Sequence, residues 1–161
     1  MTSAQVGVVA FSFGLRAPEE EPNPCNRRLA AATARIMRQT SVPVVLIAQW
    51  EIAKALPPTM AVHVVGDTPD GGYLDTERVW QVAAPILRSE GVRRVIAVAQ
   101  PVLHRAKAHR LMRADGFEPL PAPVGWIGFD SSARNRQWWT RGPVRLVLYA
   151  LRQAATGRAG R

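Results

Sequence analysis

The feature that most constrains the fold is a repeated alternation of short apolar runs with segments of helical periodicity. The apolar runs lie at residues 5–13, 42–48, 61–65, 94–99 and 117–124, and a helical pattern separates each run from the next. This alternation is typical of βαβ units, because parallel strands need a crossover connection, usually a helix. We therefore expect a three-layer Rossmann-like α/β fold with a mostly parallel five-stranded sheet in the order 3-2-1-4-5 and a C-terminal helix.

Local signals predict where the first two helices lie. Asn26 is a suitable helix cap after the polar, Pro-rich residues 16–24, and the following helix should stop near Gln39. A short helix at residues 51–56 should end before two prolines.

Later helices have clearer ends. A helix should end at Glu90, with Gly91 in the left-handed position that follows it, and Pro85 should kink this helix. Another helix is expected at residues 103–114, closed by Asp115 and Gly116. The prolines of residues 117–124 predict a strand at the sheet edge.

A helix from Pro143 to about Ala154 should follow, with an apolar stripe. The stripe consists of Val144, Val147, Leu148 and Leu151. We expect this helix to dock on its own sheet, the alternative being a basic amphipathic helix on a membrane. Residues 1–155 would form a single domain and residues 156–161 a disordered tail.

The chain has 161 residues, of which 47% are hydrophobic, which suffices for one core without disulfides. Cys25 has no partner for an internal disulfide, and the scattered His63, His104 and His109 lack zinc-ligand spacing, so we expect no metal. No apolar stretch reaches the roughly 20 residues of a transmembrane helix. The first five residues lack a basic signal-peptide region. These features predict a cytoplasmic protein.

The net charge of +9 is unevenly distributed. Residues 1–90 carry eight basic and nine acidic side chains, whereas residues 91–161 carry thirteen and three. Such an excess can attract nucleic acid, an anionic lipid surface or a phosphorylated ligand. Nearly all the basic residues are Arg, and the chain is rich in Ala. The positive charge could therefore reflect a general bias in amino-acid composition and not a dedicated binding surface.

Polar or glycine-containing segments follow the expected strands. In an open parallel sheet, ligands bind beyond the carboxyl ends of the strands, where the strand order reverses, here between the first and fourth strands. The segments are residues 12–16, 49–51, 66–76 and 100–105. The expected ligand-binding residues are Ser12, Gly14, Gln49, Trp50, Glu51, Asp75, Thr76, Gln100 and Arg105.

Two segments resemble the YdcF-like family, which includes the ElyC and SanA envelope proteins. Residues 95–123, VIAVAQPVLHRAKAHRLMRADGFEPLPAP, resemble its strand, Ser/Thr-aromatic-His-x-x-Arg-Ala turn, helix, glycine and Pro-containing strand. Residues 73–91, YLDTERVWQVAAPILRSEG, resemble its Ser-x-Asn/Asp-Thr-x-Glu-Asn helix start. The resemblance covers nearly the whole chain in element order. It implies a ligand cleft but brings no settled reaction with it.

The chain departs from the family at signature positions. With Arg105 and Ala106 aligned on the family's Arg-Ala pair, Val102 stands where the motif has histidine, which leaves His104 as the candidate acid or base. The family's glycine-rich turns after the first two strands are reduced to Ser-Phe-Gly and Ala-Gln-Trp. Close approach of backbone N–H groups to a phosphate favours glycine, so Trp50 would instead narrow the pocket or offer a stacking face.

The sequence thus predicts a cleft for a small anionic or nucleotide-like molecule. Arg105 would hold negative charge, Asp75 and Thr76 would bind hydroxyl groups, and Trp50 or Trp126 would pack against an apolar part. Transfer or hydrolysis of a phosphorylated or nucleotide-derived substrate would suit these residue types.

The sequence leaves other interpretations open, one of which is a divergent, inactive scaffold. Asp75 and Thr76 are also ordinary helix caps. The protein could instead be a non-enzymatic module whose basic C-terminal half docks an acidic partner, nucleic acid or an anionic membrane surface. The cleft assignment requires Arg105 to face Thr76 and the turn after Phe13.

Overall fold

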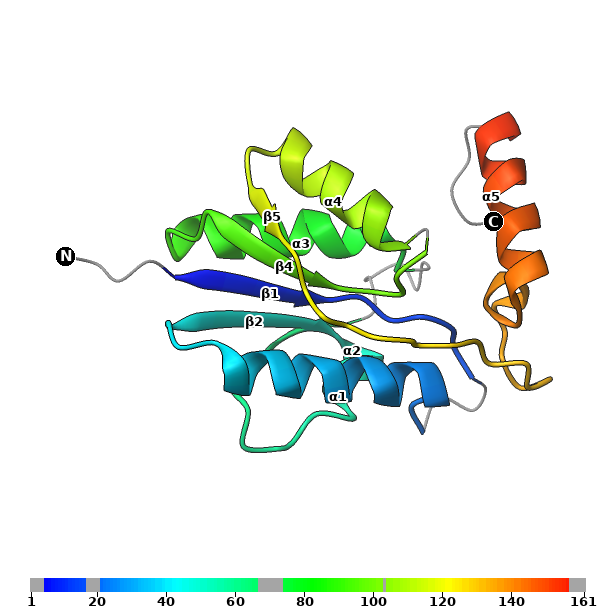
Figure 1. The fold of residues 1–161 in the computed structure, drawn as a ribbon, viewed down its shortest axis with the longest axis horizontal. Coiled ribbons are helices and arrows are strands. Elements are labelled where there is room, and N and C mark those ends of the chain that lie inside the picture. Colours follow the sequence, from blue (N-terminus) through cyan, green and yellow to red (C-terminus); the bar gives the residue numbers. More distant parts are fainter. Residues whose placement is uncertain (1–4, 17–20, 67–73, 103, 157–161) are drawn as a thin grey trace.

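The computed structural model describes residues 5–16, 21–66, 74–102 and 104–156, and its centre is a parallel sheet (Figure 1). The strands are β1 (Val6–Ala10), β2 (Val44–Gln49), β3 (His63–Val65), β4 (Arg94–Val98) and β5 (Glu118–Leu120). They lie in the order β3-β2-β1-β4-β5, and every neighbouring pair is parallel. The predicted five-stranded topology is therefore confirmed.

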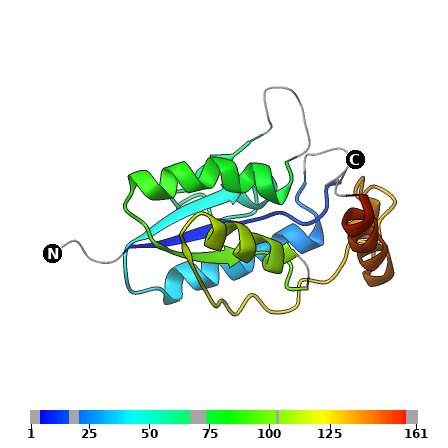
Figure 2. The same ribbon diagram turned by 90° about the horizontal axis from the view of Figure 1, so that it is seen from above.

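Helices cover both faces of the sheet. The helices of the chain are α1 (Pro24–Gln39), α2 (Trp50–Ala53), α3 (Thr76–Ser89), α4 (His104–Ala114) and α5 (Pro143–Thr156), with a 3-10 turn, η1 (Trp138–Thr140), before α5, and the first four cover the sheet. Helices α1 and α2 lie on one face, and α3 and α4 on the other (Figures 1 and 2). This arrangement confirms the three-layer architecture.

The sequence of β1 explains its central place. All five of its residues, VGVVA, are buried, as expected for a parallel strand covered on both faces. Val8 belongs to the apolar cluster under α1, and Val9 belongs to the cluster under α3 and α4. A Cβ at Gly7 would lie 2.6 Å from Cδ2 of Leu87, so glycine is what lets α3 pack closely on β1.

The start of α1 differs from the prediction. Asn23, not Asn26, is the N-cap, since the Asn23 side chain accepts from the Asn26 N–H at 2.8 Å and Pro24 takes the first helical position. The Asn26 amide instead lies inside the helix, where it accepts from the Phe13 N–H at 2.7 Å and donates to the Gly14 carbonyl at 3.0 Å. Asn26 therefore fixes the turn that leaves β1.

Other helix ends agree with local signals. The predicted end of α1 at Gln39 is confirmed. Gly91 has φ +70° and Gly116 has φ +80°, the left-handed conformation expected after a helix. Helix α3 runs through Pro85 and ends at Ser89. Strand β5 lies at the sheet edge, as its prolines predicted.

The prediction that α5 docks on the sheet through its apolar stripe is wrong. Val144, Val147, Leu148 and Leu151 are 52–70% exposed, whereas Leu146 is 7% exposed. Figure 1 shows α5 beyond the carboxyl ends of the strands, not on a face of the sheet. The opposite side of the helix packs toward η1, which leaves the stripe facing outward.

Thr156, which was predicted to begin a disordered tail, is instead the last residue of α5. Residues 157–161, most of the expected loop at 66–72 and Leu103 lie outside the described residues. No described helix is both long and apolar enough to cross a membrane.

Candidate functional site

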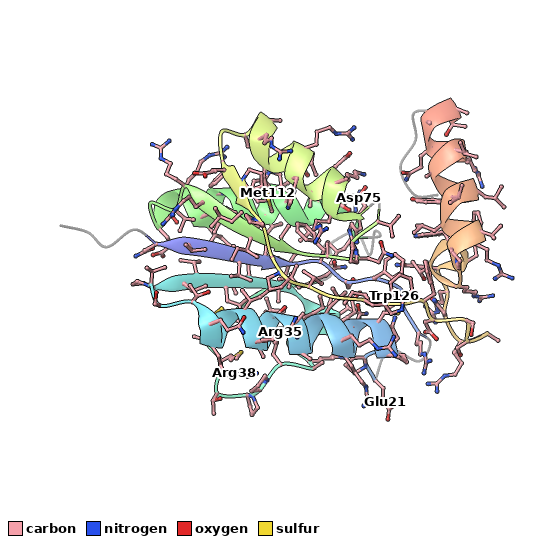
Figure 3. The ribbon with its side chains drawn as sticks, in the orientation of Figure 1. Glu21, Arg35, Arg38, Asp75, Met112 and Trp126 are labelled. Carbon is pink, nitrogen blue, oxygen red and sulfur yellow. The ribbon has the colours of Figure 1, made fainter. Side chains whose placement is uncertain are left out.

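A pocket opens at the carboxyl edge of the sheet, beyond the ends of β1 and β4. Its inner wall comes from the turn after β1 and the first turns of α3 and α4, and its outer wall from the C-terminal segment. The lining residues are Ser12, Phe13, Asp75, Thr76, His104, Lys107, Gln137, Trp139, Thr140, Leu146, Tyr149, Ala150 and Gln153. Figure 3 shows Asp75 at this edge. The cavity measures about 100 Å³, room for a small ring or a polar group of similar size.

Four of the predicted site residues meet at this pocket. Ser12, Asp75, Thr76 and His104 come from three separate segments and share one cavity. This is the edge at which the strand order reverses, so the cavity lies at the predicted location.

Two further predicted residues are buried behind the pocket. Oε1 of Gln49 accepts from the Ser12 N–H at 3.0 Å, and Nε2 of Gln49 donates to the Leu74 carbonyl at 3.4 Å. Oε1 of Gln100 accepts from the Val102 N–H at 2.9 Å. Both amides therefore hold the loops that form the pocket and do not line it.

Trp50 and Glu51 lie elsewhere. They line a smaller hollow together with Arg16 and Lys54, and the Lys54 ammonium lies 4.5 Å from the centre of the Trp50 ring. Trp126 does not line the main pocket either, and it is 71% exposed.

Gly14 contributes through its backbone. Its φ of +85° is a conformation that favours glycine, and a Cβ there would lie 2.8 Å from Nδ2 of Asn23 and 3.0 Å from Oγ1 of Thr140. Gly14 therefore allows the C-terminal segment to pack on the turn after β1.

The predicted cleft, which required Arg105 to face Thr76 and the turn after Phe13, is wrong in that respect, and the pocket is formed without Arg105. Arg105 does not line the pocket, and its Nη1 is 3.5 Å from the Ala122 carbonyl, beside β5. Lys107 contributes the cation instead. The reason is helical geometry: His104 and Lys107 are three positions apart and share a face, whereas Arg105 points another way. This spacing is the signal that sequence reasoning missed.

No protein-family model matches the sequence, and no curated protein or solved structure is significantly similar to it. The site is therefore interpreted from its own geometry, and the YdcF-like relationship stays a prediction.

His104 lies against aromatic rings at the base of the pocket. Its ring centre is 5.7 Å from that of Phe11 and 6.3 Å from that of Phe13. Burial of the ring, with a smaller contribution from Lys107, lowers the pKa of His104 to about 4, although Asp75 acts in the opposite direction. The imidazole is therefore neutral at pH 7. Its Nδ1 is buried and has no hydrogen-bond partner within the described part of the chain.

The charges around the pocket nearly balance. Asp75 accepts from the Arg78 N–H at 2.8 Å, which makes it the N-cap of α3 as well as a lining residue. The Lys107 ammonium lies 3.2 Å from Oε1 of Glu77. The lining thus combines one carboxylate and one ammonium with several neutral polar groups, and it is not a strongly cationic anion site.

The outer wall is fastened to the turn after β1 by a polar network. Nε and Nη2 of Arg16 each donate to the Asp130 carboxylate at 2.7 Å, and this contact holds the pKa of Asp130 below its usual range. The buried Asn135 side chain accepts from the Leu15 N–H at 3.3 Å and donates to Oγ1 of Thr140 at 2.8 Å. This network positions η1 and hence the outer wall of the pocket.

Most of that outer wall was not predicted from the sequence. Gln137, Thr140, Tyr149 and Gln153 were not expected at the sheet edge, whereas Trp139 had been expected to pack in the core or to cover the cleft. The rings of Trp139 and Tyr149 stack, with centres 4.6 Å apart. Only tertiary packing brings them to the pocket, so periodicity carried no signal for them.

Neither a metal nor a reactive thiol is indicated here. Among the described residues, no three His, Cys, Asp or Glu side chains lie close enough to hold a metal ion. Cys25 is buried in α1, and burial raises the pKa of its thiol to about 11. Its position near a helix start therefore does not produce a thiolate at neutral pH.

Proposed function

We propose that this protein binds a small nucleotide-like molecule, with a planar polar ring entering the pocket and an anionic group lying at its rim. The observation that carries the proposal is the convergence of four segments, distant in the sequence, on one ring-sized cavity lined mainly by aromatic and neutral hydrogen-bonding side chains. Apolar walls with a few polar groups are the usual composition of small-molecule sites.

Each part of such a ligand has a counterpart in the pocket. The Thr76 hydroxyl can donate or accept a hydrogen bond with the edge of a ring, and neutral His104 lines the same cavity. Phe13 and Trp139 provide aromatic surface against a ring. Lys107, at the start of α4, would meet the anionic group in the place that the sequence analysis gave to Arg105.

The proposal is binding and not catalysis. A histidine whose pKa is about 4 is unprotonated at pH 7, so it cannot serve as a general acid there, and it is a weak general base. Transfer or hydrolysis, which the residue types suggested, would need a different acid or base. A divergent YdcF-like relationship is part of the proposal, supported by the element order and the two similar segments.

The test is calorimetric titration with matched nucleosides and nucleoside phosphates at constant ionic strength. Thr76→Val should weaken binding of both classes by about tenfold, the loss of one hydrogen bond. Lys107→Met should weaken binding of the phosphates more than that of the nucleosides. Arg105→Met is the matched control, because Arg105 lies on the same helix but outside the pocket.

Two outcomes contradict the proposal. The first is that no nucleoside or nucleotide binds to the folded protein. The second is that Arg105→Met lowers the affinity as much as Lys107→Met, which would show a general effect of charge and not a contact in this pocket.

A further inference from the structure

Helix α5 presents an apolar face to the outside of the protein. Val144, Val147, Leu148 and Leu151 are spaced at i, i+3, i+4 and i+7 and therefore lie on one side of the helix. Their exposed fractions are 70%, 52%, 54% and 63%. A contiguous exposed patch of large aliphatic side chains marks an interaction site more often than scattered single residues do.

The other side of α5 is already occupied. Leu146, Tyr149, Ala150 and Gln153 line the pocket, and they also follow the i, i+3, i+4, i+7 spacing. The two faces are therefore opposite one another, and the apolar face points away from the body of the protein. In Figures 1 and 2, α5 lies at one end of the molecule, so a flat surface could approach it without meeting the sheet or the other helices.

The surroundings of this face are basic. Residues 131–161 contain no Asp or Glu, and their charged residues are Arg134, Arg136, Arg141, Arg145, Arg152, Arg158 and Arg161. On α5 itself, the exposed Arg145 and Arg152 lie on one flank of the apolar face, seven positions apart. Within the described part of the chain, neither of these two arginines forms an ion pair.

We propose that α5 docks this protein on an anionic lipid surface. The Val and Leu side chains would enter the boundary between headgroups and acyl chains, and Arg145 and Arg152 would contact lipid phosphates. The pocket face of α5 would remain against the protein, so docking requires no unfolding.

Two other occupants fit the observations less well. A second copy of the chain would bring two carboxylate-free, arginine-rich segments together, and like charges oppose that contact. A specific protein partner is expected to seat aromatic or Arg anchors in pockets, whereas this face has only Val and Leu on a convex helix. A bilayer needs no shape complementarity and supplies both hydrocarbon and negative charge.

The test is co-sedimentation of the full chain with vesicles at moderate salt. One set of vesicles contains only phosphatidylcholine, and the other contains equal parts of phosphatidylcholine and phosphatidylglycerol. We expect binding to the anionic vesicles and much weaker binding to the neutral ones. The double variant Leu148→Gln, Leu151→Gln should bind the anionic vesicles on the order of tenfold more weakly, since glutamine keeps helix propensity but removes apolar area.

Matched controls separate the α5 face from general effects. Val64→Gln with Val82→Gln changes two exposed apolar residues on other elements and should bind like the wild type. Arg145→Gln with Arg152→Gln should lose affinity for the anionic vesicles, whereas Arg110→Gln with Arg113→Gln, on α4, should not. Circular dichroism confirms that each variant is folded.

Three results would overturn the inference. One is the absence of wild-type binding to anionic vesicles. Another is wild-type-like binding by the Leu148, Leu151 variant, which would show attraction by charge alone. The third is a dimer in vesicle-free solution that this variant dissociates, which would assign the face to self-association. The proposal does not depend on the ligand of the pocket.

Discussion

Replacing Asp130 with Asn should destabilise the protein and loosen the C-terminal segment that forms the outer wall of the pocket. Asp130 is 3% exposed, and its carboxylate accepts two bonds of 2.7 Å from Arg16. The Arg16 side chain is 24% exposed, so water can replace part of what the variant loses. This pair is the principal charged link between the segment and the turn after β1.

The expected magnitude follows from these contacts. A hydrogen bond to a charged group contributes about 1.5–3 kcal/mol, and Asn can retain only one acceptor toward Arg16. After allowance for solvation of Arg16, the free energy of unfolding should fall by about 2–3 kcal/mol. The exposed ion pair of Arg27 and Glu21, whose charged atoms are 3.7 Å apart, is the control. Glu21→Gln should change the free energy of unfolding by less than about 0.5 kcal/mol.

The sign of the pH dependence can also be derived. Arg16 holds the pKa of folded Asp130 below the ordinary carboxyl value near 4, so the unfolded chain binds the proton more readily. The stabilisation by Asp130 is therefore fully present above pH 4 and is lost as the pH falls through the folded pKa. Asp130→Asn should remove this part of the acid sensitivity.

The assay combines urea unfolding, followed by circular dichroism, with hydrogen exchange of η1 and α5. A double-mutant cycle of Asp130→Leu with Arg16→Met isolates the coupling between the two side chains. The reasoning is refuted if Asp130→Asn unfolds within about 0.5 kcal/mol of the wild type and protection of η1 and α5 is unchanged.

Three further predictions concern single positions. Gly14→Ala should lower the free energy of unfolding in urea by about 3 kcal/mol, because it adds a clash with Asn23 to the strain of positive φ. Gly91→Ala, with open space at its Cβ, should lower it by only about 1 kcal/mol, and equal losses for the two variants would contradict the role of packing at Gly14. Pro85→Ala should raise the free energy of unfolding by about 1–3 kcal/mol, since the residue is exposed and alanine restores a backbone N–H donor inside the helix. A loss of stability would show that the helix accommodates the proline without cost. His104 should titrate by NMR with a pKa of about 4, and its contribution to stability should be lost as the pH falls from about 6.5 toward that value; a folded pKa near 6.5 would refute its burial.

Much of the fold could be predicted from local patterns. The apolar runs and the helical periods set the number, order and type of the elements, because a strand or helix must bury its own apolar residues. Crossover connections then make the sheet parallel, and β1 is central because its continuous apolar run requires cover on both faces. The predicted N-cap of α1 was wrong because two nearby residues, Asn23 and Asn26, both have side chains that can cap a helix.

The candidate site could be predicted in part. The edge of the sheet and the residues Ser12, Asp75, Thr76 and His104 followed from topology, since the loops after parallel strands must meet there. Lys107 could have been found from its spacing to His104. Arg105 was misplaced because the sequence alone does not show which side of α4 faces the sheet edge.

What the sequence by itself determined, then, is the layered α/β body. Its strands and helices bury apolar residues that recur with the period of a strand or a helix, and that period can be read from the sequence. Only the tertiary structure decided the path of the segment after β5. It ties Asp130 to Arg16, places Trp139 and Tyr149 over the pocket, and turns the apolar stripe of α5 outward. The Asp130–Arg16 contact joins residues 114 positions apart, and all of these features depend on side-chain geometry at the sheet edge, for which hydrophobic periodicity carries no information.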